Sequence, residues 1–341
     1  MKYDVTIGIP VYKSADYIQR SLESALNQTY SSIEFLIIDD GGADGSIDIV
    51  EQLRLEHQRG DDIRIIKHAQ NIGVAASRNH IIDEASGDYL YFMDSDDVIA
   101  ENTITLMMQH IHQYDAEIVF GSYEKIEITG ERTICQYPAI QLLGEDELAI
   151  FSYRKYAGIQ ASACNYLVKT SVLREHHHQF IHTDFWEDLV FTFDLVTMIK
   201  RAVFLPDITY SYLCREDSLS HYKKRTQITK SEVLKNIHSI EYLKQTASFF
   251  SHKVYFPNRC LNIMMTDFYI VCNILKRRKC IIPYIDYIEI KSIMRHPAKW
   301  SQIVHFKHLR LKNVLLYMIG KMPSYLCVAT IYCCGKMKKL L

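Results

Sequence analysis

The sequence predicts an α/β fold, with a mainly parallel sheet that carries helices on both faces and is followed by a C-terminal helical region. Two observations support this prediction. Short apolar runs alternate with segments of helical periodicity through the first 121 residues, and strands joined through helices pair in parallel by right-handed crossovers. Beyond residue 221 helical spacing dominates and the charge changes sign.

Each element of the α/β part follows from its own pattern. Apolar runs of strand length predict strands at residues 5–9, 33–38, 63–66, 89–93 and 117–121. Apolar residues three or four positions apart predict helices at residues 15–28, 47–55, 74–85 and 102–112. Two later segments, 164–169 and 173–178, are predicted as a strand and a helix.

Composition limits the class of protein. Of 341 residues, 48% are hydrophobic and 23% are charged, which is typical of a globular chain and not of a disordered one. The nine cysteines include no C-x-x-C pair, so a zinc module or a disulfide scaffold is not expected. The first residues lack the pattern of a signal peptide. We therefore expect a cytoplasmic protein.

The charge divides the chain into two domains. Residues 1–221 hold 17 basic and 35 acidic residues, a balance of −18, whereas residues 222–341 hold 22 basic and 5 acidic residues, a balance of +17. The second part should therefore meet an anionic partner, either a membrane surface or a nucleic acid. We place the domain boundary at residue 221.

Polar side chains follow several predicted strands where the strands end. Asp39 follows the second strand, and Asp94 and Asp96 follow the fourth. The carboxyl ends of parallel strands lie on one edge of a sheet, where ligands bind. Two carboxylates two positions apart can converge on Mg²⁺ or Mn²⁺; a plain turn is the alternative reading.

Neither a G-x-G-x-x-G nor a P-loop motif occurs, which argues against a dehydrogenase or a P-loop NTPase.

Six short motifs resemble those of glycosyltransferase family 2. They stand at residues 9–13 (IPVYK), 24–30 (SALNQTY), 38–41 (IDDG), 44–46 (DGS), 71–79 (NIG and ASRN) and 94–97 (DSDD). The resemblance implies a GT-A (Rossmann-like) fold, a nucleotide-sugar donor, a divalent metal (Mn²⁺ or Mg²⁺) and inversion at the anomeric carbon. One departure is Gly42, where the family often has Ser.

The resemblance also implies roles for single residues. Asp39 would accept the imide N–H of uracil, which favours a UDP-sugar. Arg78 would reach the base or the diphosphate. The full set of expected donor contacts is Pro10, Val11, Tyr12, Asp39, Arg78, Asp94, Ser95, Asp96 and Arg215. The expected metal contacts are Asp96, Asp94 and His221.

A second acidic pair, Glu187-Asp188, resembles the family's catalytic motif. An inverting transfer needs one general base to take the proton of the acceptor hydroxyl. We predict that Asp188 is this base and that Glu187 orients it or contacts the sugar. The alternative is that both carboxylates only stabilise a helix N-terminus.

The basic region 222–341 interleaves aromatic residues with Lys and Arg. Its apolar segment 314–334 is interrupted by Lys321 and Pro323, so it is too broken for one membrane span. We expect an amphipathic helical pair in the plane of an anionic membrane. The alternative is a helical appendage that packs on the catalytic domain.

Three functional classes follow from these features. The leading one is a metal-dependent, inverting glycosyltransferase for polysaccharide biosynthesis, with a glycan or lipid-linked acceptor, peripheral at the inner face of the cell membrane. A catalytically silent nucleotide-sugar-binding protein is the second. A nucleic-acid-binding protein is the third, but it leaves the acidic motifs unexplained, so we expect no nucleic acid partner. The sequence does not fix the sugar, the linkage or the oligomeric state.

Overall fold

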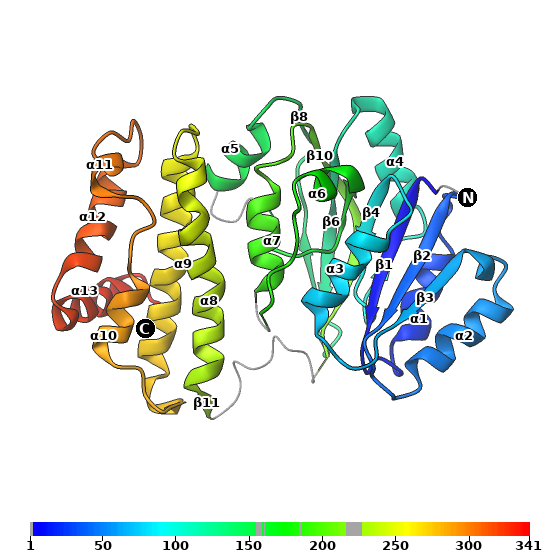
Figure 1. The fold of residues 1–341 in the computed structure, drawn as a ribbon, viewed down its shortest axis with the longest axis horizontal. Helices are drawn as coiled ribbons and strands as arrows, with labels where there is room; N and C mark the ends of the chain where they lie inside the picture. The colour runs from blue at the N-terminus through cyan, green and yellow to red at the C-terminus, as the bar shows by residue number, and fades with distance from the viewer. Residues whose placement is uncertain (1–2, 155–158, 160, 184–185, 216–226) are drawn as a thin grey trace. The chain divides into compact units, whose positions relative to one another are not determined.

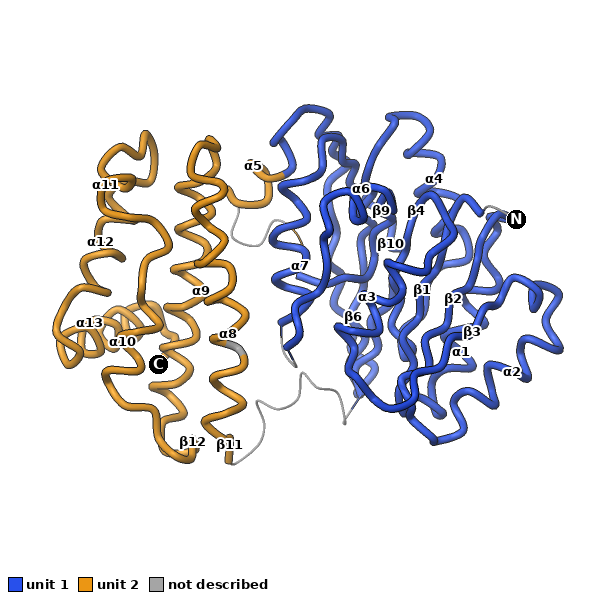
Figure 2. The backbone as a smooth tube through the Cα atoms, viewed as in Figure 1, with its two compact units in different colours: residues 1–148, 161–219 blue, residues 149–160, 220–341 orange. Residues whose placement is uncertain are grey.

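The computed structural model describes residues 3–154, 159, 161–183, 186–215 and 227–341. The chain forms two compact units (Figure 2). Unit 1 comprises residues 1–148 and 161–219, and unit 2 comprises residues 149–160 and 220–341. The predicted boundary at residue 221 lies outside the described residues. Unit 2 also includes the segment 149–160, which the sequence analysis placed in the first domain.

Unit 1 is built on one sheet of ten strands (Figure 1). These are β1 (Val5–Val11), β2 (Ile33–Asp39), β3 (Ile63–Lys67), β4 (Tyr89–Phe92), β5 (Val98–Ile99), β6 (Ile118–Ile126), β7 (Arg132–Cys135), β8 (Ile140–Leu142), β9 (Tyr166–Lys169) and β10 (Ala202–Leu213). Their order is β3-β2-β1-β4-β9-β6-β10-β5, with β7 on β6 and β8 on β10. The first four strands pair in parallel, as predicted.

The other half of the sheet is mixed. Strand β9 lies between β4 and β6 and is antiparallel to both. Before β9, the chain forms β7, which is antiparallel to β6, and β8, which is antiparallel to β10. The alternation of strands and helices in the first 121 residues therefore predicts the parallel half, and the segment that contains β7, β8 and β9 adds antiparallel strands.

Helices cover the sheet of unit 1. They are α1 (Ile18–Leu26), α2 (Ser46–Glu56), α3 (Val74–Glu84), α4 (Thr103–Tyr114), α6 (Thr170–Glu175) and α7 (Glu187–Leu195), and a 3-10 turn lies at Gly60–Asp62. Helix α3 packs closely on β1, because a Cβ atom at Gly8 would lie 2.3 Å from Ile81. Side chains alternate along a strand, so Ile7 and Ile9 point to the opposite face, where both are fully buried.

Unit 2 is mainly helical. It contains the greater part of α5 (Glu147–Arg154), then α8 (Lys230–Thr246), α9 (Phe256–Lys276), α10 (Tyr287–Ile293), α11 (Trp300–Ile303), α12 (Arg310–Lys321) and α13 (Ser324–Met337), with 3-10 turns at Ala247–Phe250 and Arg278–Cys280. Two short strands, β11 (Ile228–Thr229) and β12 (Ile281–Ile282), pair in parallel. Tyr153 joins α5 to α9, because its hydroxyl accepts a hydrogen bond of 2.5 Å from the buried Arg259.

Local signals set several helix ends in unit 2. Thr229 and Glu232 form a capping box at the start of α8, and Asp286 and Glu289 form another at the start of α10. The predicted helical pair is present, because α12 ends at Lys321 and α13 begins just after Pro323. Among the described residues, no helix has both the length and the apolar content that crossing a bilayer would need.

Candidate functional site

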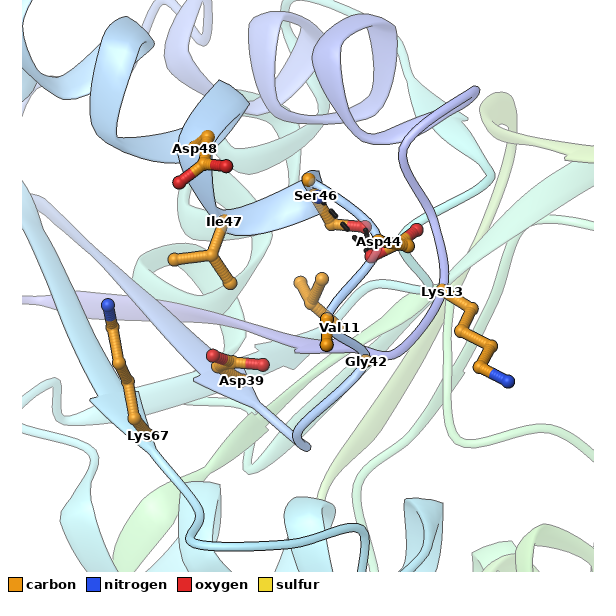
Figure 3. A pocket seen from close by; sticks show the side chains of 11 residues that line it. Val11, Lys13, Asp39, Gly42, Asp44, Ser46, Ile47, Asp48 and Lys67 are labelled. Atoms are coloured by element: carbon orange, nitrogen blue, oxygen red, sulfur yellow. Dashed lines mark hydrogen bonds between the residues drawn. The ribbon is translucent and has the colours of Figure 1, made fainter.

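A cavity of roughly 270 Å³ lies at the carboxyl ends of β1 and β2 (Figure 3). Val11 and Asp39 are register partners at these ends, and both line the cavity. Lys67, at the end of β3, is the register partner of Asp39 in the neighbouring strand and lines the same cavity. One Asp39 oxygen accepts a hydrogen bond of 3.0 Å from the Gly41 amide. The carboxyl ends therefore meet at one edge of the sheet, as predicted.

The predicted residues around the first strand are not all at this cavity. Val11 lines it, whereas Pro10 stays in the β1–β2 ladder opposite Ile38. Tyr12 is 42% exposed, and its ring lies 5.3 Å from the ammonium nitrogen of Lys13. Of these three candidates, only Val11 contributes to the cavity wall.

Gly42 fits its place because the backbone is close. A Cβ atom at this position would lie 2.7 Å from the backbone nitrogen of Lys13, which also lines the cavity. A contact that short would force the loop to move. The loop after β2 is therefore adapted to glycine at the position where the family often has Ser.

Arg78 connects two acidic segments that are far apart in the sequence. Its guanidinium donates to Asp94 at 2.8 Å and to Glu187 at 3.0 Å. The residue is 5% exposed, and its guanidinium lies 5.5 Å from the Phe180 ring centroid. Burial alone would lower the pKa of Arg78, but the Asp94 and Glu187 carboxylates raise it above its ordinary value. The side chain therefore stays charged and holds α3, the β4 end and α7 together.

The residues after β4 form a dense cluster of negative charge. The Asp96 carboxylate lies 2.7 Å from Nε of Arg215. Burial and the Asp94 carboxylate raise the pKa of Asp96 to about 6, against the opposing effect of Arg215. Ser95 stands between Asp94 and Asp96 in the sequence. Its hydroxyl lies 2.7 Å from the Ser14 hydroxyl, and this contact connects the turn after β4 to the loop after β1.

These residues suit a divalent cation in part. Asp94 and Asp96 each use one oxygen for an arginine, and a carboxylate has a second oxygen to offer. The raised pKa of Asp96 reflects charge that a cation would neutralise. Within the described part of the chain, no three His, Cys, Asp or Glu side chains converge on one ion site. The predicted ligand His221 lies outside that part. Oxygens of a bound ligand would have to complete the coordination.

Helix α7 presents the second acidic pair. It begins at Glu187, directly after Trp186, which has a left-handed φ of 62° and gives no side-chain cap. The Asp188 carboxylate accepts a hydrogen bond of 2.7 Å from the Leu189 amide. Burial and the Glu187 carboxylate raise the pKa of Asp188 to about 7, while Arg78 opposes this shift. Glu187 is thus fixed by Arg78, and Asp188 is poised to exchange a proton near neutral pH.

Comparison with known proteins shows which family the first part of the chain resembles. Residues 6–165 match the model of a family described as "Glycosyl transferase family 2". The glycosyltransferase GlyG of Streptococcus pneumoniae serotype 4 is 26% identical over 224 residues, which cover 63% of this chain and 72% of that protein.

Residues 6–165, just under half of the chain, match as a glycosyltransferase family 2 domain. Two solved structures show that its fold is GT-A. S. aureus TarS 1–349 in complex with UDP-GlcNAc has a TM-score of 0.54 at 19% identity, covering 94% of this chain and 90% of that one. The mannosyltransferase PcManGT from Pyrobaculum calidifontis, in complex with GDP-Man and Mn²⁺, has a TM-score of 0.52 at 14% identity, covering 97% and 87%. The protein is a glycosyltransferase.

The position of Asp97 in this glycosyltransferase does not follow from the sequence. This residue is 1% exposed and accepts hydrogen bonds from the Tyr210 hydroxyl at 2.6 Å and the Leu213 amide at 2.8 Å. Burial and the carboxylates of Asp94 and Asp96 raise its pKa to about 8. Asp97 therefore anchors the β4 turn to β10. The sequence signal was the third Asp in DSDD, but its partners lie more than 110 residues away.

Asp40 is a second missed residue of the family 2 site. It is buried and accepts hydrogen bonds of 2.9 Å from the amides of Ile72 and Gly73. It also lies 2.8 Å from Nδ1 of His68. These contacts fix the loop that leads into α3, the helix that carries Arg78. The adjacent acidic pair Asp39-Asp40 was the available signal.

Proposed function

We propose that this glycosyltransferase moves a sugar from a UDP-sugar to a hydroxyl of a glycan or lipid-linked acceptor in polysaccharide biosynthesis, with inversion. The observation that carries the proposal is the bridge made by Arg78 between Asp94 and Glu187. It brings the acidic cluster after β4 next to the acidic pair that opens α7. A donor diphosphate and an acceptor hydroxyl can therefore be handled at one place.

The donor base is assigned to the cavity at the ends of β1 and β2. Asp39 lines this cavity and uses one oxygen for Gly41, which leaves its other oxygen to accept the imide N–H of uracil. The Val11 side chain supplies an apolar wall for the flat base. The UDP-GlcNAc in the TarS complex is a donor of the same class.

A divalent metal, Mn²⁺ or Mg²⁺, is assigned to Asp94 and Asp96. Such an ion would neutralise the charge that develops on the leaving nucleoside diphosphate. The chain's own part is to hold the two carboxylates: Arg78 fixes Asp94 and Arg215 lies against Asp96. The Mn²⁺ in the PcManGT complex supports this class of ion.

Asp188 is assigned as the general base. The acceptor oxygen attacks the anomeric carbon from the face opposite the diphosphate, the bond to the diphosphate breaks, and the hydroxyl proton passes to the Asp188 carboxylate. A pKa of about 7 keeps this carboxylate partly ionised at neutral pH and basic enough to accept a proton. Glu187 is held by Arg78 and therefore serves as the orienting residue.

Peripheral contact with the inner face of the cell membrane is assigned to unit 2. On α12, Leu311, Leu315 and Met318 are exposed in one stripe, spaced by four and three residues. Residues 222–341 carry a balance of +17, which complements anionic lipid. The pair Leu311→Asp and Leu315→Asp should abolish flotation with phosphatidylglycerol vesicles, whereas Leu55→Asp on α2, which is also exposed, should not. Equal flotation of the wild type, the Leu311 and Leu315 double variant and Leu55→Asp would remove the proposed membrane contact.

A donor screen tests the proposed reaction. Thermal shifts with UDP-, GDP- and dTDP-sugars in the presence of Mn²⁺ should be largest for a UDP-sugar, and should shrink for Asp39→Asn because an amide oxygen is a weaker acceptor. The anomeric configuration of the transferred sugar, measured by NMR, should be opposite to that of the donor. A larger shift with a GDP-sugar would contradict the donor assignment, and a retained configuration would contradict the inverting mechanism.

A further inference from the structure

Unit 2 contains a cavity of roughly 680 Å³ that plays no part in the proposed reaction. We call it the unit 2 pocket. It lies where α8, α10, α12 and the segment after α10 meet, as its lining residues Ile237, Ile288, Met294 and Tyr317 show. A Cβ atom at Gly320 would lie 2.3 Å from the carbonyl oxygen of Met294, so α12 runs directly against that segment. The pocket is therefore framed by closely packed backbone.

One wall of the unit 2 pocket is apolar and continues to the surface. Ile237, Met294 and the Tyr317 ring provide apolar lining. Ile288 also lines the pocket and is 72% exposed, so the apolar wall extends outward to solvent. The exposed stripe on α12, which ends at Met318, lies beside Tyr317 on the same helix. A hydrocarbon chain could follow this wall from the pocket to the surface.

The polar lining carries net positive charge. Lys291, Arg295 and Lys321 line the pocket, and Glu241 is the carboxylate among the lining residues. Arg295 forms an ion pair with Glu241, so these two charges cancel. Within the part of the chain that the structure describes, Lys291 and Lys321 form no ion pair with a carboxylate. Burial lowers the pKa of His296, another lining residue, to about 4, so this ring is neutral at neutral pH.

The two lysines also have a simpler role, which does not explain the whole site. Lys291 lies in the last turn of α10 and Lys321 in the last turn of α12, where a cation complements the helix dipole. That effect requires neither a cavity nor an apolar wall. Two ammonium groups from different helices that line one partly apolar cavity instead match a ligand with an anionic head and a hydrocarbon part.

We propose that the unit 2 pocket binds the phosphate headgroup of an anionic membrane lipid, with Lys291 and Lys321 at the phosphate and the acyl chain along Ile288 and Tyr317. This inference deepens the proposed membrane contact of unit 2 and is independent of the transfer reaction. It adds a defined lipid site to a contact that would otherwise rest on general attraction between a basic surface and acidic lipid.

Short-chain phosphatidylglycerol, used below its micelle concentration, is the probe. Trp300 reports binding, because its ring lies 5.4 Å from that of Tyr317 and a Trp186→Phe background makes it the single tryptophan. We expect saturable binding. The pair Lys291→Gln and Lys321→Gln should weaken it about 30-fold, since each lysine near an anionic lipid contributes about fivefold. The matched pair Lys307→Gln and Lys312→Gln removes the same charge from exposed positions outside the lining and should change affinity less than about twofold.

Two further probes test the two halves of the ligand. Glycerol 3-phosphate has the phosphate without a chain, and octyl glucoside has a chain without the phosphate; each should bind at least about tenfold more weakly than the lipid. Equal binding of glycerol 3-phosphate would assign the pocket to a soluble phosphate, and equal binding of octyl glucoside would make it an apolar cavity. Either result overturns the proposal, as does equal weakening by the two lysine pairs.

A second variant and a flotation assay keep the outcomes separate. Ile288→Asp changes an exposed residue and should weaken lipid binding while circular dichroism shows a folded protein. Failure of the wild type to float with vesicles, together with saturable short-chain binding, would remove the proposed membrane contact and keep the pocket. Flotation that is unchanged by the Lys291 and Lys321 substitutions, without short-chain binding, would keep the contact and remove the pocket.

Discussion

Each unit contains a nearly buried cation, and the two cations differ in what surrounds them. In unit 1, Arg78 divides its contacts between Asp94 and Glu187. In unit 2, Lys244 lies 2.6 Å from the fully buried Asp267 and donates to the carbonyl oxygen of Ile293. The first cation holds acidic segments that also reach the edge of the sheet, whereas the second joins α8 to α9 inside a helical core. Burial of a charge is therefore not evidence of function by itself; the accessibility of its partners is the difference.

Loss of Arg78 should have the largest effect. Arg78→Met leaves Asp94 and Glu187 uncompensated and mutually repelling, so we expect transfer to fall about 100- to 1000-fold and the free energy of unfolding to fall by about 3–5 kcal/mol. Rates should be measured on the folded fraction at low temperature. Arg78→Lys, which keeps the charge but not the two-pronged geometry, should retain more stability than activity. Near-native transfer by Arg78→Met would show that the reaction does not need the bridge between Asp94 and Glu187.

Loss of Lys244 should affect stability alone. Lys244→Met leaves Asp267 buried without its cation, which should lower the free energy of unfolding by about 3–5 kcal/mol. Denaturant titration would measure this loss. Adding Asp267→Leu should recover most of it, because a well-packed apolar pair can replace a buried ion pair. The transfer rate per folded molecule should change less than twofold; a loss of rate like that of Arg78→Met would show that both cations serve the reaction.

Acidity should act on the two units in different ways. For unit 1, kcat should fall as pH drops below about 7, because protonated Asp188 cannot accept the acceptor proton.

For unit 2, burial raises the pKa of Asp267 to about 7, with Lys244 opposing the shift. The folded state then holds a proton that the unfolded chain releases at lower pH, so the contribution of Asp267 to stability should decrease from about pH 4 to about pH 7 and level off above it.

Comparing Asp267→Asn with the wild type isolates that contribution. The amide cannot titrate, so the difference in unfolding free energy between the two proteins should vary with pH between about 4 and 7 and stay constant at higher pH. A pH-independent difference would contradict the Asp267 assignment. A rate profile without an inflection near neutral pH would contradict the Asp188 assignment.

Two glycines should give the smallest and most local effects. A Cβ atom would meet Lys13 at Gly42 in unit 1 and Met294 at Gly320 in unit 2. Gly42→Ala should weaken UDP-sugar binding and spare lipid binding, and Gly320→Ala should do the reverse, each by about 1–3 kcal/mol of local strain. Isothermal titration with both ligands measures the two effects. Loss of both kinds of binding in either variant would mean that the strain spreads through the whole chain.

The sequence predicted the part of unit 1 that depends on local patterns. The first four strands, their parallel pairing and the positions of Asp39 and Asp94 follow from apolar runs and from what ends them. The antiparallel strand β9 does not follow, because it enters the sheet only after β7 and β8. Local pattern says which residues form an element, and it does not say which strand is its neighbour.

The site was predictable as a set of residues and not as a set of contacts. Arg78 was expected at the donor, but its partner Glu187 is 109 positions away, and no spacing within one sequence indicates that pair. Asp97 is the last residue of the DSDD motif, and nothing in its local sequence indicates that it accepts a hydrogen bond from Tyr210 of β10. In unit 2, the break at Lys321 and Pro323 predicted the helical pair, whereas the unit 2 pocket depends on how α8, α10 and α12 pack.

In the proposed reaction, Asp188 takes the acceptor proton at a site that Arg78 and Glu187 organise. Single-turnover transfer by Asp188→Asn should be measured together with UDP-sugar affinity by calorimetry. We predict a rate lower by about 100- to 10,000-fold with donor affinity changed less than threefold, because the amide keeps the shape but cannot accept the proton. A near-native rate with intact donor binding would contradict this role of Asp188.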